Sequence, residues 1–308
     1  MSKEEQWNAM LKLKKLPYGS IHPISNPNLE LELADIINLV NEEDCLNDAD
    51  IHNKFLNRYQ SWILETKNNT IRGINLFQAS AFSNGTTEAF DKFYLKHSRR
   101  RLRYFRGEYM YHTAIGKHYF KEVAHIDDQP IAENDVVVIS FPFANTGGEH
   151  PEYLNTIIEC NKLQVPVLID CAYINIAGGL KFDFDYPCIQ EIVFSLSKAF
   201  PVGHLRIGMR LTKHDNDDPL FVYNKNRYVN RFSAAVGLKL IERYDPDYNY
   251  NTYRNQQLSF CKELGVDPSP TVVFGTSKTL YPEYNRGGAE NRLCFSKYLH
   301  SNLLPQNT

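Results

Sequence analysis

The stretch 191–211, EIVFSLSKAFPVGHLRIGMRL, decides the fold class, because it opens on a run that is apolar on nearly every residue. Such runs are typical of strands covered on both faces, as in a mainly parallel sheet. Two further runs of this character lie upstream, VVVIS at 136–140 and PVLID at 166–170. We therefore predict strands over 136–143, 165–170, 191–197 and 205–211.

Segments with the apolar spacing of helices lie between these runs. We expect helices over 86–97 and 151–163, and one earlier strand over 71–82. An alternation of strands and helices is typical of a sheet sandwiched between helices, with right-handed crossovers. The sequence therefore predicts an α/β protein whose large domain is a three-layer α/β/α sandwich around a mainly parallel sheet.

The two ends of the chain have a different pattern. Helices are expected over 29–40 and within 51–70, then over 219–244 and 251–264, with short strands over 271–274 and 292–296. We predict an N-terminal arm and helix in 1–50, a large domain in 51–215 and a small α+β domain in 216–308. We expect the arm to pack with the small domain or with a partner subunit.

The composition is that of an ordinary globular protein. Of 308 residues, 43% are hydrophobic and 23% are charged, and 36 acids against 34 bases leave a net charge of −2. This balance does not favour nucleic acid or a membrane surface as a partner. No apolar run is long enough to span a membrane, and the start of the chain does not predict a secretory signal. The six cysteines are scattered, so we expect reduced thiols in a cytoplasmic protein and no metal site.

Polar residues follow the predicted strands at the points where they end. Ligands of open α/β sheets bind beyond the carboxyl ends of the strands, so these residues are candidates for a site. They are the turn at 83–87, Asn145, Asp170, Tyr173, Ser195, Ser197 and Lys198, with Arg206 opening the next strand. Each has an ordinary structural explanation alone, whereas together they describe an anion-binding turn, an acid, a lysine and an arginine at one edge.

One chemical group would satisfy this whole set. Gly85, Thr86 and Thr87 at a helix N-terminus suit a phosphate, as do Ser195 and Arg206. A partly desolvated Lys198 beside cationic groups would have a lowered pKa and could capture a carbonyl. Asp170 would keep a heteroaromatic nitrogen protonated. A lysine that captures an aldehyde and an acid at the ring nitrogen are the pattern of pyridoxal-phosphate sites.

With these motifs, the sequence resembles the fold-type-I pyridoxal-phosphate enzymes, in particular the class I/II aminotransferases. SLSKAFPVGHLRIG (195–208) is similar to the family's Ser-x-x-Lys followed by Arg-x-Gly, and IDCAY (169–173) to its Asp-x-x-Tyr. SNGTTEAF (83–90) resembles the phosphate loop, and RLCFS (292–296) the strand with the carboxylate-binding arginine. FANTGG (143–148) resembles the family's Asn-Pro-Thr-Gly turn without its proline. The resemblance runs from about residue 71 to 296.

The resemblance implies a role for each matching residue. Lys198 would form the Schiff base (internal aldimine) with pyridoxal 5′-phosphate and later move protons, and Asp170 would pair with the ring nitrogen. Tyr173 and Asn145 would bind the ring's phenolic oxygen, and either Tyr109 or Tyr111 would stack on the ring. The phosphate would be held by Gly85, Thr86, Thr87, Ser195 and Arg206. Asn145 and Arg292 would contact the substrate, with Arg292 on its carboxylate.

The resemblance also implies a homodimer with shared active sites, in which Tyr18 or the stretch 224–231 would supply the partner's contacts. The leading functional hypothesis is an aminotransferase that moves an amino group between an amino acid and a keto acid. Arg292 favours it, because a clamped carboxylate is not lost. The alternative is another pyridoxal-phosphate enzyme, such as a decarboxylase, a lyase or a cyclising or oxidative enzyme. A non-catalytic binding module is a third hypothesis, which the intact Lys198, Asp170 and Arg206 disfavour.

Overall fold

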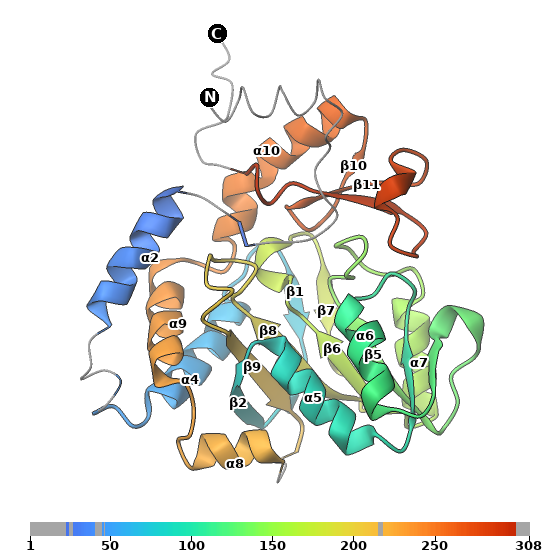
Figure 1. Ribbon diagram of the computed structural model, residues 1–308, viewed down its shortest axis with the longest axis horizontal. Helices are drawn as coiled ribbons and strands as arrows, with labels where there is room; N and C mark the ends of the chain where they lie inside the picture. The colour runs from blue at the N-terminus through green and yellow to red at the C-terminus, as the bar shows by residue number, and fades with distance from the viewer. Residues whose placement is uncertain (1–22, 25–26, 41–44, 46, 215–217, 300–308) are drawn as a thin grey trace.

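The computed structural model describes residues 23–24, 27–40, 45, 47–214 and 218–299, and a central sheet dominates this part of the chain (Figure 1). Its seven described strands run in the order β2-β9-β8-β6-β5-β3-β4. They are β2 (Ala79–Asn84), β3 (Arg101–Tyr104), β4 (Val123–His125), β5 (Asp135–Ser140), β6 (Val167–Asp170), β8 (Ile189–Ser195) and β9 (Ile207–Thr212). Strand β9 is antiparallel to both β2 and β8, and the other neighbouring pairs are parallel. The predicted mainly parallel sheet is confirmed.

Helices cover both faces of this sheet. Val136 and Val138 of β5 join Phe90 of α5 (Thr86–His97) in one apolar cluster, with α6 (Met110–Tyr119) on the same side. Val137 and Ile139 belong to the other cluster, which includes residues of α4 (Ile51–Leu64), α7 (Tyr153–Lys162) and α9 (Arg231–Arg243). Successive residues of a strand point to opposite faces, so a fully apolar strand packs on both layers. The three-layer α/β/α architecture is therefore as predicted.

A smaller unit follows in the chain. Strands β10 (Asp267–Pro268), β11 (Phe274–Ser277) and β12 (Asn291–Cys294) form an antiparallel sheet against α10 (Tyr248–Leu264), and Figure 1 shows α10 with β10 and β11 at one end of the molecule. This is the predicted α+β part. The remaining elements are α2 (Pro27–Leu39), α8 (Pro219–Lys225), the strand pair β1 (Thr70–Arg72) and β7 (Lys181–Asp183), and short 3₁₀ turns at Ile74–Leu76, Ile126–Asp128, Ile174–Ile176 and Pro282–Tyr284.

Helix α9 lies in the chain segment assigned to the small domain, but it packs on α4 and β9. The boundaries at residues 50 and 215 stay a prediction. None of the helices in the described ranges combines the length and the apolar character needed to cross a membrane.

Two expected elements are interrupted. The strand expected over 71–82 is broken by Gly73, which has φ +78° and lies where a Cβ would meet the backbone nitrogen of Asp185 at 2.6 Å. The helix expected over 219–244 is two helices, because Arg227 adopts φ +64° and the Asn230 side chain accepts a hydrogen bond from Ser233 N at 3.0 Å to start α9. Both predictions of a single element were wrong.

The segment 98–135 carries two strands and a helix that apolar periodicity did not reveal. Strand β3 reads RLRY, yet Arg103 is fully buried and its Nη1 donates to Asp135 Oδ2 at 2.6 Å. Arg101 donates to the other oxygen of Asp135 at 2.6 Å. Ion pairing with Asp135 makes burial of the Arg103 charge tolerable, and the two arginines give this interior strand the sequence pattern of an exposed one.

Candidate active site

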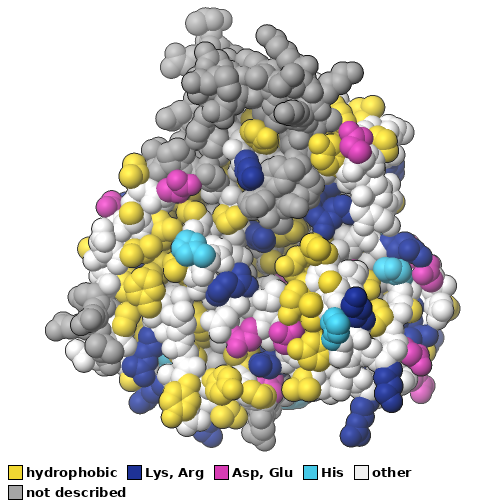
Figure 2. All heavy atoms as spheres, in the orientation of Figure 1, with side chains coloured by type: hydrophobic (Ala, Val, Ile, Leu, Met, Phe, Trp, Pro, Cys, Tyr) yellow, Lys and Arg dark blue, Asp and Glu magenta, His cyan; other side chains and the backbone are white. Residues whose placement is uncertain are grey.

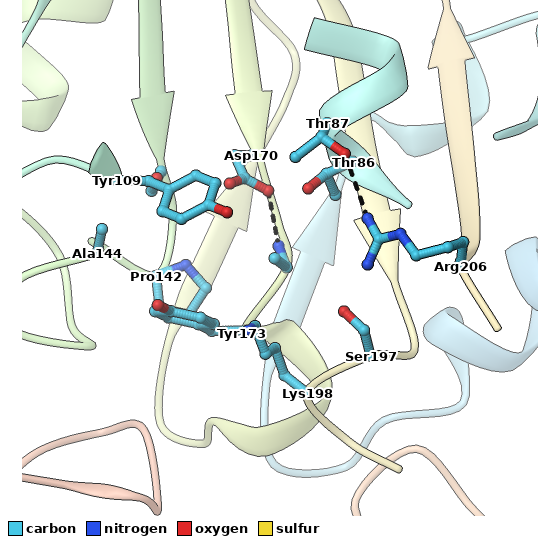
Figure 3. Close-up of a pocket in the computed structure, with 12 residues that line it drawn as sticks. Thr86, Thr87, Tyr109, Pro142, Ala144, Asp170, Tyr173, Ser197, Lys198 and Arg206 are labelled. Carbon is cyan, nitrogen blue, oxygen red and sulfur yellow. Dashed lines mark hydrogen bonds between the residues drawn. The ribbon is translucent and has the colours of Figure 1, made fainter. Parts of the chain in front are cut away.

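A pocket lies where strands β2, β5, β6 and β8 end (Figure 3). Strand β9 runs in the opposite direction, so its first residues reach the same edge. This topology explains how distant parts of the sequence converge on one cavity. The lining residues are Thr86, Thr87, Tyr109, Ser140, Pro142, Ala144, Asp170, Ala172, Tyr173, Ser197, Lys198 and Arg206.

Arg206 lies across the N-terminus of α5. Its Nη2 donates to Asn84 O and to Thr87 Oγ1, both at 3.2 Å, and its Nη1 donates to Gly203 O at 3.1 Å. Gly85 leaves the space for this, since a Cβ there would lie 2.1 Å from Nη2. The free N–H groups and the dipole of a helix N-terminus attract anions. The guanidinium adds a fixed positive charge at the same point.

Gly208 allows β9 to approach this turn closely. A Cβ on Gly208 would lie 2.8 Å from the Cα of Gly85, so any other residue at this position would clash with the backbone. The two glycines therefore permit the close contact between the start of β9 and the start of α5, and this contact brings Arg206 to the helix.

Asp170 ends β6 as a buried acid, with 5% of its surface exposed. Its Oδ1 accepts a hydrogen bond from Ala172 N at 3.1 Å. Burial, and next the charge of Glu108, raise the pKa of Asp170 to about 7, against the opposing effects of the Ala172 N–H and Lys198. Burial therefore disfavours the ionised form of Asp170, and a cationic partner in the pocket would stabilise that form.

Lys198 follows β8 in the turn that leads to β9, and its side chain runs toward Tyr173 (Figure 3). Burial lowers the pKa of the Lys198 amine, and the charges of Arg206 and Arg292 lower it further, against Cys294 and Asp170. Burial raises the pKa of Tyr173 to about 12. The pocket thus holds an amine that loses its proton more readily than an exposed lysine.

The structure separates the two candidate stacking tyrosines. Tyr109 lines the pocket, close to Asp170 (Figure 3). Tyr111 is outside the set of lining residues, and its OH donates to Asp91 of α5 at 2.8 Å. Of the two, Tyr109 alone is therefore placed to contact a ligand ring.

The serine and asparagine candidates lie differently from each other. Ser195 Oγ is buried, donates to Ile207 O at 3.2 Å and shares a 2.8 Å hydrogen bond with Ser197 Oγ. Ser197 is the serine that lines the pocket. Asn145 Nδ2 donates to Glu290 O at 2.9 Å, and Asn145 Oδ1 is buried without a hydrogen-bond partner among the described residues. Asn145 follows the lining residue Ala144 but is not itself in the lining.

Arg292 lies on β12, fully buried. Its Nη1 donates to Ala144 O and its Cζ lies 4.3 Å from the centre of the Phe274 ring. Tyr173 interacts with the guanidinium, whereas burial lowers the pKa of Arg292. The structure thus brings Arg292 beside the lining residue Tyr173 but does not place it in the lining.

Several pocket residues were not assigned a role from the sequence. Pro142, Ala144 and Ala172 are apolar and carry no motif of their own, and Ser197 was noted only as a residue at a strand end. Glu108 lies behind the pocket. The sequence feature that could have pointed to it is its position directly before Tyr109, a candidate stacking residue.

No protein-family model and no curated protein matches the sequence. Solved structures match over most of the chain at low identity. The histidinol-phosphate aminotransferase from Clostridium acetobutylicum has a TM-score of 0.58 and 16% identity, over 92% of this chain and 98% of that one. The L-threonine-O-3-phosphate decarboxylase from Porphyromonas gingivalis has a TM-score of 0.58 and 14% identity, over 91% and 93% of the two chains. The PLP-bound C-S lyase from Staphylococcus hominis has a TM-score of 0.57 and 12% identity, over 80% and 78%.

These three enzymes carry different activities on one architecture, so the likeness identifies what they share, which is the fold. The resemblance inferred from the motifs at 83–90, 169–173 and 195–208 agrees with it. The protein has the fold of the fold-type-I pyridoxal-phosphate-dependent enzymes, in their aminotransferase-like form.

Proposed function

We propose that the pocket binds pyridoxal 5′-phosphate and that the protein is a pyridoxal-phosphate-dependent enzyme acting on an amino acid. The observation that carries this proposal is the convergence of three groups on one cavity: the buried acid Asp170, the partly desolvated amine of Lys198 and the guanidinium of Arg206. A protonated pyridine, an aldehyde and a phosphate are the partners that these three groups would respectively take.

The chemistry of the lining fits the two ends of such a ligand. Arg206, Thr86 and Thr87 gather donors at the N-terminus of α5, as a phosphate requires, and Ser197 adds a hydroxyl nearby (Figure 3). Tyr109 offers an aromatic face close to Asp170, which suits a cationic ring. Asn145 Oδ1, buried and without a described partner, and Tyr173 are the groups proposed to bind the ring's phenolic oxygen.

When bound, the cofactor supplies an electron sink for a bond broken at the substrate's α-carbon. Lys198 would supply the nucleophilic amine that captures the cofactor's aldehyde, because its lowered pKa leaves more of the amine unprotonated. The same amine would accept and return the proton at the α-carbon. Asp170 would hold the ring nitrogen protonated, Arg206 would bind the phosphate, and Tyr109 would contact the ring.

For the reaction, we propose the transfer of an amino group from an amino acid to a keto acid. Its support is Arg292, which lies behind the lining residue Tyr173 and is proposed to retain a substrate carboxylate. The second candidate is decarboxylation or elimination on the same fold. It is favoured by the engagement of Arg292 with Ala144 O and the Phe274 ring, outside the lining.

A screen of single amino acids against the cofactor-loaded protein distinguishes these reactions. We expect a true donor to convert the cofactor to its amine form, with release of one equivalent of the matching keto acid. Absorbance spectra and mass spectrometry of the products measure both. Release of carbon dioxide, ammonia or a thiol without the amine form would contradict amino-group transfer and support the second candidate.

We propose a homodimer in which residues 224–231 lie at the interface. Figure 2 shows hydrophobic side chains over α8, where Val222 and Tyr223 are 45% and 46% exposed, and Tyr228, in the turn after α8, is 78% exposed. Exposed apolar patches of this kind mark interaction surfaces. Tyr18, the other candidate for partner contacts, lies outside the described residues. Light scattering of the native protein and of Tyr228→Lys tests this, and a monomeric wild-type protein would contradict it.

Replacement of Gly85 by alanine is expected to weaken cofactor binding at least about tenfold, because the new methyl group displaces Arg206 from the helix N-terminus. Gly179→Ala is the matched control. It imposes a similar backbone strain at φ +81°, but no atom lies within 4 Å of its Cβ position. Equilibrium titration of the cofactor-free proteins with pyridoxal phosphate measures both. Equal weakening in the two variants would show that backbone strain, not Arg206, sets the affinity.

A further inference from the structure

A second buried acid, Glu108, lies behind the pocket. It directly precedes Tyr109 and has 4% of its surface exposed. Its Oε1 accepts a hydrogen bond from Ser140 N at 2.7 Å. Its Oε2 accepts one from Ser140 Oγ at 2.6 Å and one from Tyr109 N at 3.0 Å. All three donors are uncharged, so these hydrogen bonds satisfy the carboxylate without neutralising it.

The hydrogen bonds to Ser140 place Glu108 near Asp170. Ser140 is the last residue of β5 and pairs with Asp170 across the parallel β5–β6 ladder. Glu108 is bound to Ser140 through both of its oxygens, and Ser140 and Asp170 both line the pocket. Two carboxyl groups are therefore held on neighbouring strand ends, shielded from water.

Ionisation of both groups costs free energy, because burial and mutual repulsion disfavour two negative charges. Burial raises the pKa of Glu108 to about 7, and burial with the charge of Glu108 raises the pKa of Asp170 to about 7. Near neutral pH, this arrangement favours a single proton on the two acids over either full protonation or full ionisation.

Charged and titratable groups from the surrounding elements leave this balance in place. Arg286, in the loop before β12, lowers the pKa of Glu108, and Lys198 lowers that of Asp170, but neither offsets burial. The phenols of Tyr94 on α5 and Tyr109 face the same acids, and both have raised pKa values, so they stay neutral.

We propose that Glu108 is a positioning residue which, with Asp170, holds one proton in the cofactor-free protein and gives it up when the cationic ring of the cofactor binds. The inference rests on the proposed cofactor. In this step a carboxyl O–H bond breaks and its proton passes to solvent, because the pyridine nitrogen of the cofactor already carries a proton near neutral pH. The acid pair goes from one negative charge to two, and the positive charge of the bound ring balances the added negative charge.

Without Glu108, Asp170 would ionise at lower pH in the empty pocket. Binding of the cationic ring would then release no proton from the site. The number of protons exchanged with solvent on cofactor binding therefore reports on Glu108 directly, and a purely structural role would not change it.

The test is calorimetric titration of the cofactor-free protein with pyridoxal phosphate near neutral pH, in buffers of different ionisation enthalpy. We expect Glu108→Gln, which keeps an acceptor for Ser140 N, to release as much as about one proton fewer than wild type. The midpoint of its pH profile should fall by about one unit. Glu108→Asp, which keeps the charge, should behave like wild type. Asp128→Asn removes an exposed carboxylate paired with Arg106 at 2.7 Å, and it should also match wild type.

Equal proton exchange in wild type and Glu108→Gln would overturn the inference. Infrared difference spectra of the wild-type protein provide a check that does not depend on any variant folding. Addition of the cofactor should abolish the band of a protonated carboxyl group, and a spectrum without that loss would also overturn it. If pyridoxal phosphate produces no Lys198-dependent absorbance band in wild type, the proposed function fails as well. A band without the proton difference removes only the role of Glu108.

Discussion

Replacing Lys198 with alanine is expected to abolish the visible absorbance band formed with pyridoxal phosphate and to lower turnover by a factor on the order of 10⁴. The amine is proposed both to hold the cofactor covalently and to move the proton at the substrate carbon, so its loss removes two functions at once. Absorbance titration and initial rates with an identified donor measure the two effects.

Lys213→Ala is a matched control for this variant. Burial lowers the pKa of Lys213 as it does that of Lys198, but the Lys213 amine donates to Tyr186 O at 2.6 Å and lies outside the pocket lining. We expect its band and its rates to stay close to those of wild type. A band that persists in Lys198→Ala would refute the assignment of the nucleophile.

Asp170→Asn is expected to lower turnover by a factor on the order of 10²–10³. Asparagine preserves the shape and can still accept the hydrogen bond from Ala172 N, but it carries no charge to hold the ring nitrogen protonated. The loss should fall on turnover more than on cofactor affinity, because the phosphate contacts of Arg206 are untouched. Rates that match wild type would show that Asp170 does not face the ring nitrogen.

The same substitution should stabilise the cofactor-free protein at high pH. The pKa of Asp170 is raised to about 7 in the folded protein from 3.8, so folding favours its protonated form. Wild type therefore loses stability as the pH rises from about 4 to 7, whereas Asp170→Asn is spared this loss. Above pH 7, the variant should be more stable by up to about 4 kcal/mol, and the difference should vanish toward pH 4.

Urea unfolding of both cofactor-free proteins at pH 8 and pH 5 measures this difference. A variant that is less stable than wild type at pH 8 would mean that Asp170 is ionised and well compensated in the folded protein. Together with the rate measurement, the experiment asks whether this acid is retained for function at a cost in stability.

Much of the fold could be read from local pattern. Helix α5 covers the range 86–97 that its apolar spacing predicted. The buried strands β5, β6 and β8 each begin within two residues of the predicted start. Strand β3 could not be read in this way, because the buried Arg103 is satisfied by Asp135, 32 residues away, and by backbone carbonyl groups of the segment 124–130. Periodicity reports on burial, and it fails where a distant ion pair makes a charge tolerable inside.

In the candidate site, too, local motifs identified some residues, and only the folded structure could place others. Short motifs were sufficient to name Lys198, Asp170 and Arg206, since each stands at a strand end and their spacing in the chain is specific. Spacing could not choose between Tyr109 and Tyr111, because the chain turns into α6 between them and sends one to the pocket and the other to Asp91.

The sequence by itself determined the architecture and the chemical character of the pocket, because apolar runs and strand-end polar residues are properties of short segments. Only the tertiary structure decided which atoms meet. It placed Ser197 rather than Ser195 at the surface of the cavity and held Arg292 against Phe274. It also brought Glu108 beside Asp170 through Ser140, a contact set by the pairing of β5 with β6. Contacts between residues far apart in the chain depend on how the layers pack, and no local pattern records that.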